Sequence, residues 1–261
     1  MPEMIELKSE AEIGKMRAAG AVVAEILREL AAMVEPGVTT AELDSKAERM
    51  ISLAGCRSAF KNYQVGDVVY PAVLCASVND EVVHGIPSER PIEEGDLVSL
   101  DFGVEKEGYY GDSAVTVVVG DTDDESRRLV EVTRRSMEAG IEQMRPGQRL
   151  GDVGAAVQEV AEGGGFSVVR SFVGHGIGRA LHEDPQLPNF GKRGRGQALR
   201  VGMVLAIEPM INAGGYGVRV KEDGWTAVTT DGRRSAHFEH TVAITDEGPQ
   251  VLTAAAEEAS L

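Results

Sequence analysis

The sequence contains two copies of one arrangement of turns and helices, and this internal repeat limits the folds open to the chain. In each copy a Pro-Gly turn precedes a helical segment that a glycine closes, with the same internal spacing. The two copies are Pro36-Gly37 with Gly55, and Pro146-Gly147 with Gly165. Because proline and glycine interrupt helices and form turns, the repeat predicts two similar supersecondary units.

A second repeat follows the first in each copy. Gly95 and Gly202 each precede an apolar strand, and a carboxylate stands six residues after the glycine, at Asp101 and Glu208. We therefore expect two similar halves packed about a pseudo-twofold axis, with a site between them that draws ligands from both. The halves cover residues of about 9–120 and 121–250. No Ser/Pro-rich linker separates them, so we expect residues 1–261 to form one domain.

The periodicity of the apolar residues predicts the main helices and strands. Helices are expected at residues 9–34, 39–54, 123–144 and 150–162. Strands are expected at residues 72–78, 96–104, 109–119, 203–207, 217–220, 226–229 and 239–244, the second and third of which form a hairpin. Residues 254–261 are expected to form a short polar tail.

The composition is that of a globular protein and excludes several classes of function. A content of 43% hydrophobic and 26% charged residues excludes global disorder. The net charge of −16 argues against nucleic acids and anionic membranes as partners, because both require basic surface. The first six residues lack the features of a secretory signal, and no apolar run approaches the roughly 20 residues of a membrane helix. With only Cys56 and Cys75, a disulfide framework is excluded and a cytoplasmic location is expected.

The first candidate site residues are Asp101 and Asp112 in the predicted hairpin. If Lys106-Glu107 forms its loop, the two carboxylates are directly opposed, with Cβ atoms roughly 5 Å apart. Two unpaired carboxylates would repel each other, so the pair requires a cation. Dinuclear sites hold their metals about 3.5–4 Å apart, a separation that this pair can span. Two solvated hairpin acids are the alternative, which this motif alone does not exclude.

A glycine-rich segment at residues 173–185 carries two histidines. Its three glycines at alternate positions argue against a helix and indicate close approach of the backbone to a ligand. Pro185 argues against a phosphate-binding loop that opens a helix, and Gln186 occupies the position where a zinc-binding helix would need its second histidine. We therefore interpret His175 as a candidate ligand on a loop, with His182 as a second imidazole nearby.

Two glutamates complete the candidate metal site. Glu208 and Glu239 stand in strand-like segments at positions where a half-buried strand should be apolar. A buried, unpaired carboxylate is costly, so each glutamate implies a partner. Together with Asp101 and Asp112 they contribute a charge of about −4, which two divalent cations would balance.

This set of motifs resembles the type I methionine aminopeptidases, in the short bacterial form without a long N-terminal extension. The residues that carry the resemblance are His84, Asp101, Asp112, His175, His182, Glu208 and Glu239, within matching segments at residues 77–87, 221–226 and 236–241. The resemblance covers nearly the whole chain. It implies the α+β "pita-bread" fold, in which two pseudo-symmetric halves surround a curved, mainly antiparallel sheet with helices on its outer face.

The resemblance also implies the roles of the metal-site residues. Asp101 would bind one metal ion, His175 and Glu208 the other, and Asp112 and Glu239 would bridge both. A bridging water or hydroxide would attack the carbonyl of the N-terminal methionine, with Glu208 as the proton shuttle. One imidazole among oxygen ligands suits Mn, Fe(II), Co or Zn.

The remaining site residues surround the substrate in the same interpretation. His182 would stabilise the tetrahedral oxyanion, and His84 would contact the amide nitrogen of the scissile bond. Tyr63, Cys75 and Trp225 would form the methionine pocket, because a thioether suits apolar, aromatic and sulfur-containing surroundings. The sequence departs from the family pattern near this pocket, at Phe60, at Leu181 and in an apparent insertion at residues 64–69, which also affects the place of Tyr70.

Two alternatives to this function stay open. The first is an Xaa-Pro aminopeptidase or dipeptidase of the same fold, which Asp101-Phe102-Gly103 favours and in which Glu222 would be the last ligand. Such enzymes normally carry a large extra N-terminal domain. The second is a catalytically inactive binding protein on this fold, which would have lost ligands that this chain retains. The expected substrates are the N-termini of nascent polypeptides. The enzyme is expected to be a monomer that contacts the ribosome.

Overall fold

The computed structural model describes residues 5–254, so the predicted tail lies outside the described residues except for Ala254. The described residues form four α-helices: α1 (Glu10–Met33), α2 (Thr40–Leu53), α3 (Asp124–Glu142) and α4 (Leu150–Gly163). Each agrees with a predicted helix to within two residues at either end. The predicted cap of α1 is also present, because Ser9 and Glu12 exchange the reciprocal hydrogen bonds of a capping box.

The strands form one large curved sheet and three small ones. Among residues 5–254, nine strands make up the large sheet, in the order β1-β6-β7-β16-β11-β9-β10, with β4 beside β6 and β17 beside β16. Their bounds are β1 (Arg57–Ser58), β4 (Cys75–Val78), β6 (Leu97–Lys106), β7 (Tyr109–Val118), β9 (Gly174–Gly176), β10 (Glu183–Leu187), β11 (Val204–Ile207), β16 (Glu239–Thr245) and β17 (Gly248–Val251). Every strand pair in the described part of the chain is antiparallel.

The small sheets lie beside the large one. They contain β15 (Ser235–His237), β12 (Met210–Asn212) and β8 (Ser167–Val168); β13 (Val218–Val220), β14 (Ala227–Thr229) and β5 (Glu81–Val83); and the hairpin of β2 (Gln64–Val65) and β3 (Val68–Val69). All the predicted strands are present, although residues 72–74 are not part of β4. The other strands of the described residues, which have two to five residues each, were not predicted, because so short a segment shows little alternation.

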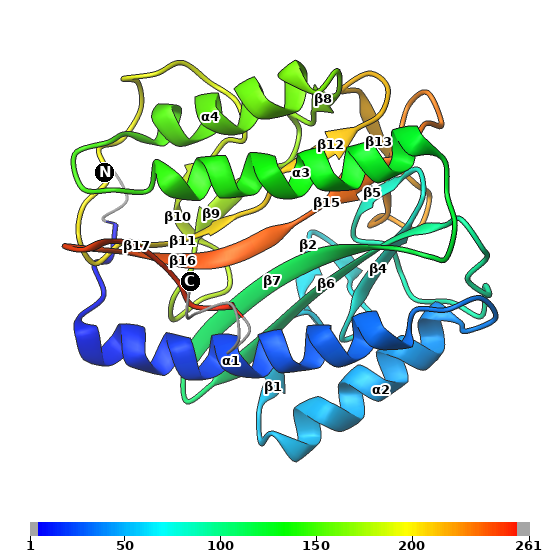
Figure 1. Cartoon of the computed structure of the whole chain (residues 1–261). Helices are drawn as coiled ribbons and strands as arrows, with labels where there is room; N and C mark the ends of the chain where they lie inside the picture. Colours follow the sequence, from blue (N-terminus) through cyan, green and yellow to red (C-terminus); the bar gives the residue numbers. More distant parts are fainter. Residues whose placement is uncertain (1–4, 255–261) are drawn as a thin grey trace.

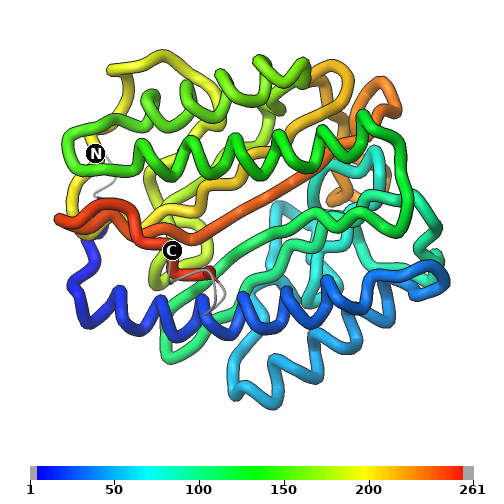
Figure 2. Tube along the Cα trace, viewed as in Figure 1, coloured from blue at the N-terminus to red at the C-terminus, as the bar shows by residue number. Residues whose placement is uncertain are grey.

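Helices from the two parts of the chain flank the sheet on opposite sides in the view of Figure 1. In that view α1 and α2 lie below β6, β7 and β16, and α3 and α4 lie above these strands. The same trace in Figure 2 shows the blue and green helices on either side of the central strands. The two parts of the large sheet join where β7 pairs with β16.

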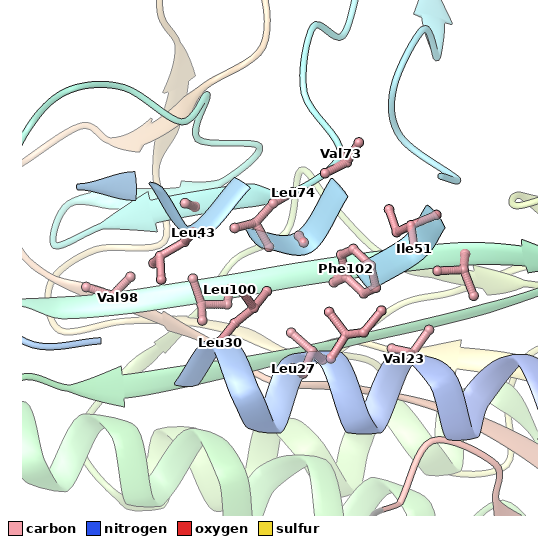
Figure 3. Packing of buried hydrophobic residues seen from close by; sticks show 14 of the residues in the cluster. Val23, Leu27, Leu30, Leu43, Ile51, Val73, Leu74, Val98, Leu100 and Phe102 are labelled. Atoms are coloured by element: carbon pink, nitrogen blue, oxygen red, sulfur yellow. The ribbon is translucent and has the colours of Figure 1, made fainter. Parts of the chain in front are cut away.

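One face of β6 belongs to the core beneath α1 and α2. Val98, Leu100 and Phe102 alternate along the strand and pack in one apolar cluster with Leu27 of α1 (Figure 3). Because successive residues of a strand point to opposite faces, Asp101 points away from this cluster. The apolar alternation of β6 therefore turns this carboxylate to the face that the helices leave open.

The second part of the sheet follows the same rule. Ile207 of β11 and Val242 of β16 pack with Val157 of α4 in another buried cluster. Glu208 follows Ile207, and Glu239 lies three residues before Val242, so alternation turns both glutamates to the opposite face. Both parts of the sheet thus direct acidic side chains away from their helices.

The turn of the β6–β7 hairpin differs from the predicted one. Lys106 pairs with Tyr109, so the loop is Glu107-Gly108 rather than Lys106-Glu107. Both loop residues have left-handed backbone conformations, with φ of 52° and 84°. This is the requirement of a tight turn that matches the twist of the strands, and glycine meets it at the second position.

The changed turn moves the two hairpin aspartates out of direct opposition. Asp101 pairs with Ala114, and Asp112 pairs with Gly103. The prediction of a directly opposed pair is therefore wrong, and the two carboxylates are diagonal neighbours. Because the register differs by two residues, both side chains still point to one face.

No helix among residues 5–254 combines the length and the apolar content that a membrane span requires.

Candidate active site

A cavity of about 850 Å³ opens on the face of the sheet that carries the acidic side chains. All ten residues predicted for the site line it: Tyr63, Cys75, His84, Asp101, Asp112, His175, His182, Glu208, Trp225 and Glu239. Phe60, Tyr70 and Leu181, where the sequence departs from the family pattern, also line the cavity. The fold therefore gathers into one place residues that lie far apart in the sequence.

The strand pairing places the acidic residues in rows across the sheet. Ala114 of β7 pairs with Asp101 on one side and with Glu239 on the other, so these two carboxylates flank β7 in one row. Asp112 lies two residues back on β7 and points to the same face. Its backbone exchanges hydrogen bonds with the Thr241 hydroxyl, at 3.1 and 2.8 Å.

His175 lies in a strand, and not on a loop as predicted. It is the middle residue of β9 and pairs with Ala206 of β11, which in turn pairs with Thr241. These pairings continue the row of Asp112 across the sheet. Ligand atoms of Asp112, His175 and Glu239 all lie within 4.8 Å of one another, which makes these three a compact candidate metal site.

The glycines on either side of His175 allow its strand to pair closely with its neighbours. A Cβ atom at Gly174 would collide with the carbonyl oxygen of Ala206, and one at Gly176 with that of Asp184. Only glycine therefore lets β9 fit between its neighbouring strands. This close packing carries His175 into the cavity, and Gly174 also lines the cavity wall.

The buried carboxylates lack partners of their own. Oxygen atoms of Asp101, Asp112 and Glu239 are buried without a hydrogen-bond partner among the described residues. Burial raises the pKa of Asp112 to about 7. Burial, and after it the charge of neighbouring carboxylates, raises the pKa of Asp101, of Glu208 and of Glu239 well above the ordinary value. Such a cluster is unfavourable as it stands, and divalent cations would compensate it.

The tautomer of His175 suits a metal ligand. Its Nδ1 lies 2.9 Å from the carbonyl oxygen of Gly176, which can only accept, so Nδ1 carries the proton. Its Nε2 is then unprotonated and lies 3.4 Å from Glu208 Oε1. Burial, and after it the neighbouring His182, lowers the pKa of His175 to about 3, so the ring is neutral. The donor set therefore fits one imidazole and four carboxylates around hard or borderline divalent ions.

Two aromatic residues contact His84 in the wall of the cavity. His84 follows β5 with a left-handed φ of 59°. Its ring meets the rings of Trp225 and Phe172 edge to face, with centroids 6.2 and 5.5 Å apart. The Asp223 carboxylate accepts from the backbone N–H groups of Trp225 and Thr226, both at 2.8 Å, which holds the turn before β14.

Tyr63 and His182 form a contact that the sequence did not reveal. The Tyr63 hydroxyl lies 2.7 Å from His182 Nδ1, and the His182 ring lies against that of His175, with centroids 4.3 Å apart. No periodicity or motif signals a contact between residues so far apart.

Residues 64–69, predicted as an insertion, form the β2–β3 hairpin directly after Tyr63, and Val65 of this hairpin lines the cavity.

Comparison with known proteins gives the family. The profile of metallopeptidase family M24 matches residues 14–246. The chain belongs to metallopeptidase family M24. It is therefore a metal-dependent hydrolase by descent, and the family's use of divalent metal agrees with the carboxylate–histidine cluster described above.

The most similar relatives within this family share one name. A methionine aminopeptidase from Clostridium perfringens is 50% identical over 250 residues, which cover 96% of this chain and 99% of the relative. A methionine aminopeptidase from Bacillus subtilis is 47% identical over 250 residues, which again cover 96% of this chain and 99% of the relative. A crystal structure of the Thermotoga maritima methionine aminopeptidase superposes with a TM-score of 0.93 at 50% identity, covering 96% of this chain and 99% of that one. The resemblance to methionine aminopeptidases and the pita-bread fold are confirmed.

The alternative enzymes are more distant. The prolidase from Pyrococcus horikoshii superposes with a TM-score of 0.75 at 22% identity and covers 95% of this chain but only 63% of its own. At that identity the similarity concerns the fold alone. The relatives that match at nearly full length therefore favour the methionine aminopeptidase interpretation over the Xaa-Pro peptidase.

Proposed function

We propose that this chain removes the N-terminal methionine from nascent polypeptides whose second residue is small. The observation that carries the proposal is the position of the carboxylate–histidine cluster, which shares one cavity with the apolar, aromatic and sulfur-containing residues Tyr63, Cys75 and Trp225. The cluster suits hydrolysis, and the wall suits a thioether side chain. The full-length relatives named methionine aminopeptidase support the same substrate.

In this proposal the cluster holds two divalent ions, which Mn, Fe(II), Co or Zn can supply. Asp101 would hold one ion, His175 and Glu208 would hold the other, and Asp112 and Glu239 would be shared by both. The rows across β6, β7 and β16 support this division, because Asp112 and Glu239 lie on adjacent strands between Asp101 and His175. The ions, when bound, polarise the scissile carbonyl and acidify the attacking water.

The chain's own residues then move protons and stabilise charge. Glu208 takes a proton from the attacking water and delivers it to the leaving amine, which its position beside His175 supports. His182 donates a hydrogen bond to the oxyanion of the tetrahedral intermediate. His84, whose ring packs edge to face with those of Trp225 and Phe172, contacts the amide nitrogen of the scissile bond.

The presence of His84 and His182 in the cavity wall supports the specificity. The methionine side chain fills the pocket beside Tyr63, Cys75 and Trp225, which leaves the second residue between His84 and His182. A large second side chain would collide with these histidines. Phe60 and Leu181 alter the wall of the pocket relative to the family pattern, so we expect the catalytic efficiency to shift and norleucine to be accepted in place of methionine. We place the enzyme in the cytoplasm as a monomer that meets its substrates at the ribosome.

The test is the release of free methionine from a series of Met-Xaa-Ser peptides. Metal-free enzyme receives Mn or Co, and the second residue is varied from Gly, Ala and Ser to Arg. We expect rapid release for the small residues and none for Arg. Ala-Pro peptides serve as the matched comparison. Equal rates for Ala and Arg, or cleavage before proline without a requirement for methionine, would contradict the proposal.

A further inference from the structure

Two imidazoles lie against each other in the cavity, and each has a different partner at Nδ1. His175 faces a backbone carbonyl, which fixes the proton on Nδ1 and leaves Nε2 free to bind metal. His182 faces the Tyr63 hydroxyl at 2.7 Å, and a hydroxyl, unlike a carbonyl, can donate. Neighbouring rings with opposite partners can therefore hold opposite tautomers.

We propose that Tyr63 is a positioning residue for His182: its hydroxyl donates to Nδ1 and thereby holds the proton on Nε2, the nitrogen that meets the oxyanion. This inference rests on the proposed role of His182 as the oxyanion donor. It changes the function assigned to Tyr63, whose ring lines the pocket while its hydroxyl acts on the imidazole. A donor to the oxyanion must carry a proton, and the Nδ1–H tautomer of His182 would present a bare nitrogen instead.

The direction of this hydrogen bond follows from the properties of both groups. Burial raises the pKa of the Tyr63 hydroxyl above its ordinary value, so the phenol keeps its proton and remains a donor. A neutral imidazole carries one proton on its two ring nitrogens, so the other nitrogen can accept, and Nδ1 of His182 is the nitrogen that the Tyr63 hydroxyl reaches. The ring contact between Tyr63 and His182, with centroids 5.2 Å apart, restricts the rotation of both rings.

The β2–β3 hairpin supplies the backbone that holds Tyr63 in this position. The Tyr63 N–H donates to the carbonyl of Phe60 at 2.8 Å, and the Tyr63 carbonyl accepts from the Tyr70 N–H at 2.8 Å. Asn62 on its other side donates to the Tyr70 carbonyl at 3.0 Å, with a left-handed φ of 70°. Tyr63 therefore lies at the base of a closed loop, and the segment predicted as an insertion has a function: its stem aims the phenol at His182.

The proposal predicts a specific kinetic effect of Tyr63→Phe. The phenyl ring preserves the pocket wall and removes only the hydroxyl, so KM for Met-Ala-Ser should remain unchanged. Without the donor, part of the His182 population carries its proton on Nδ1, and kcat should fall about three- to tenfold, the effect expected for one hydrogen bond. Tyr216→Phe removes an exposed hydroxyl outside the cavity and is the matched control. A Tyr63→Phe enzyme with unchanged kcat would contradict the proposal.

A double-mutant cycle separates this role from packing. In the His182→Ala background the Tyr63 hydroxyl has no imidazole to orient, so adding Tyr63→Phe should cause no further loss of kcat. Additive losses would mean that Tyr63 acts independently of His182, and would overturn the proposal. The metal content of all variants should equal that of the unmodified enzyme.

The protonation of His182 can also be observed directly in the unmodified enzyme. The chain has five histidines, so ¹⁵N-labelled imidazole signals of the zinc-loaded protein can be assigned by comparison with His182→Ala. We expect an unprotonated Nδ1 and a protonated Nε2 at neutral pH, and a shift toward protonated Nδ1 in Tyr63→Phe. A protonated Nδ1 in the unmodified enzyme would overturn the proposal. This spectrum needs no methionine release, so failure of the proposed function would be visible separately in the peptide assay.

Discussion

The two parts of the large sheet hold their candidate metal ligands in different ways. In the first part, Asp101 and Asp112 stand within β6 and β7, strands of ten residues each that pair along their whole length. In the second part, His175 occupies a strand of three residues, Glu208 follows one of four, and Glu239 is the first residue of β16. A continuous ladder positions the aspartates, whereas the other three ligands depend on how short strands fit together.

This difference shows two physical routes to one metal site. A long hairpin fixes its side chains through its own hydrogen bonds, and a change in its turn shifts them along one face. Short strands have little pairing energy of their own, so their position depends on neighbours that approach closely, as at Gly174 and Gly176. We therefore expect the first part to tolerate steric changes that the second part does not.

The largest expected effect is the loss of the ligands that join the two parts. Asp112→Ala and Glu239→Ala should each abolish the binding of two metal ions and reduce methionine release by several orders of magnitude, because each removes a carboxylate proposed to bridge both ions. Metal analysis of the dialysed variants measures the first effect, and the Met-Ala-Ser assay the second. Two tightly held ions in either variant would contradict the assignment.

Glu239→Gln is the matched control for that loss. It keeps the size of the side chain but removes one charge from a buried cluster whose carboxylates lack partners. In the presence of a chelator this variant should unfold at a higher temperature than the unmodified protein, because the metal-free cluster is self-repelling. A lower unfolding temperature under these conditions would show that Glu239 stabilises the fold without metal.

The next largest effect concerns His182, which lies in the second part but outside the ligand set. His182→Ala should keep both metal ions and lose about a hundred- to a thousandfold in kcat, the effect of removing one oxyanion donor. KM should change less than kcat, because the charge develops only in the transition state. Loss of metal from this variant would make His182 a ligand and would change the division of roles between the two parts.

A pair of glycine substitutions compares the two parts directly. In Gly176→Ala the new methyl group would collide with the backbone of Asp184 and Glu183, so we expect the free energy of unfolding to fall by about 1–3 kcal/mol. In Gly103→Ala it would meet the Cβ atom of Ala59 at 2.9 Å and Asp112 Oδ1 at 3.0 Å, and no backbone atom lies as close. We expect this variant to lose less stability than Gly176→Ala and to bind metal more weakly. Equal destabilisation, measured by urea unfolding, would remove the distinction between the parts.

The smallest effect concerns the caps of corresponding helices. The Thr39 side chain caps α2 and forms a capping box with Glu42, whereas the corresponding residue before α4, Arg149, has no side-chain cap of this kind. Thr39→Ala should therefore lower the free energy of unfolding by about 1 kcal/mol. Arg149→Ala should change it less, and a larger loss there would show that the Arg149 side chain has another structural role.

The chemistry of the site could be predicted from the sequence because acids in apolar strands are conspicuous. Asp101 and Glu239 interrupt segments that otherwise read as buried strands, and burial of a carboxylate requires compensation. The common face of Asp101 and Asp112 was also predictable despite the wrong turn, because an error of two residues preserves the alternation. The preference for Glu107-Gly108 over Lys106-Glu107 was available from the glycine alone.

Other features depend on contacts between distant segments and leave no local signal. The sequence predicts His175 on a loop because a histidine between two glycines shows no alternation typical of a strand. The strand β9 forms only because its backbone pairs with β10 and β11. The same holds for the Tyr63–His182 contact, whose partners are 119 residues apart. Local patterns therefore reveal which residues carry chemistry, whereas the packing of short elements decides how they meet.

Because β7 pairs with β16, the two parts of the sheet can join only late in the synthesis of the chain. A ribosome that has released the chain as far as β7 has delivered Asp101 and Asp112, but His175, Glu208 and Glu239 are still to come. Glu239 arrives with β16, the last strand but one of residues 5–254, and its pairing with Ala114 joins the two parts of the sheet. A growing chain therefore cannot bring all the candidate ligands together until nearly all of it has been made, so we expect full metal loading only at the end of its own synthesis.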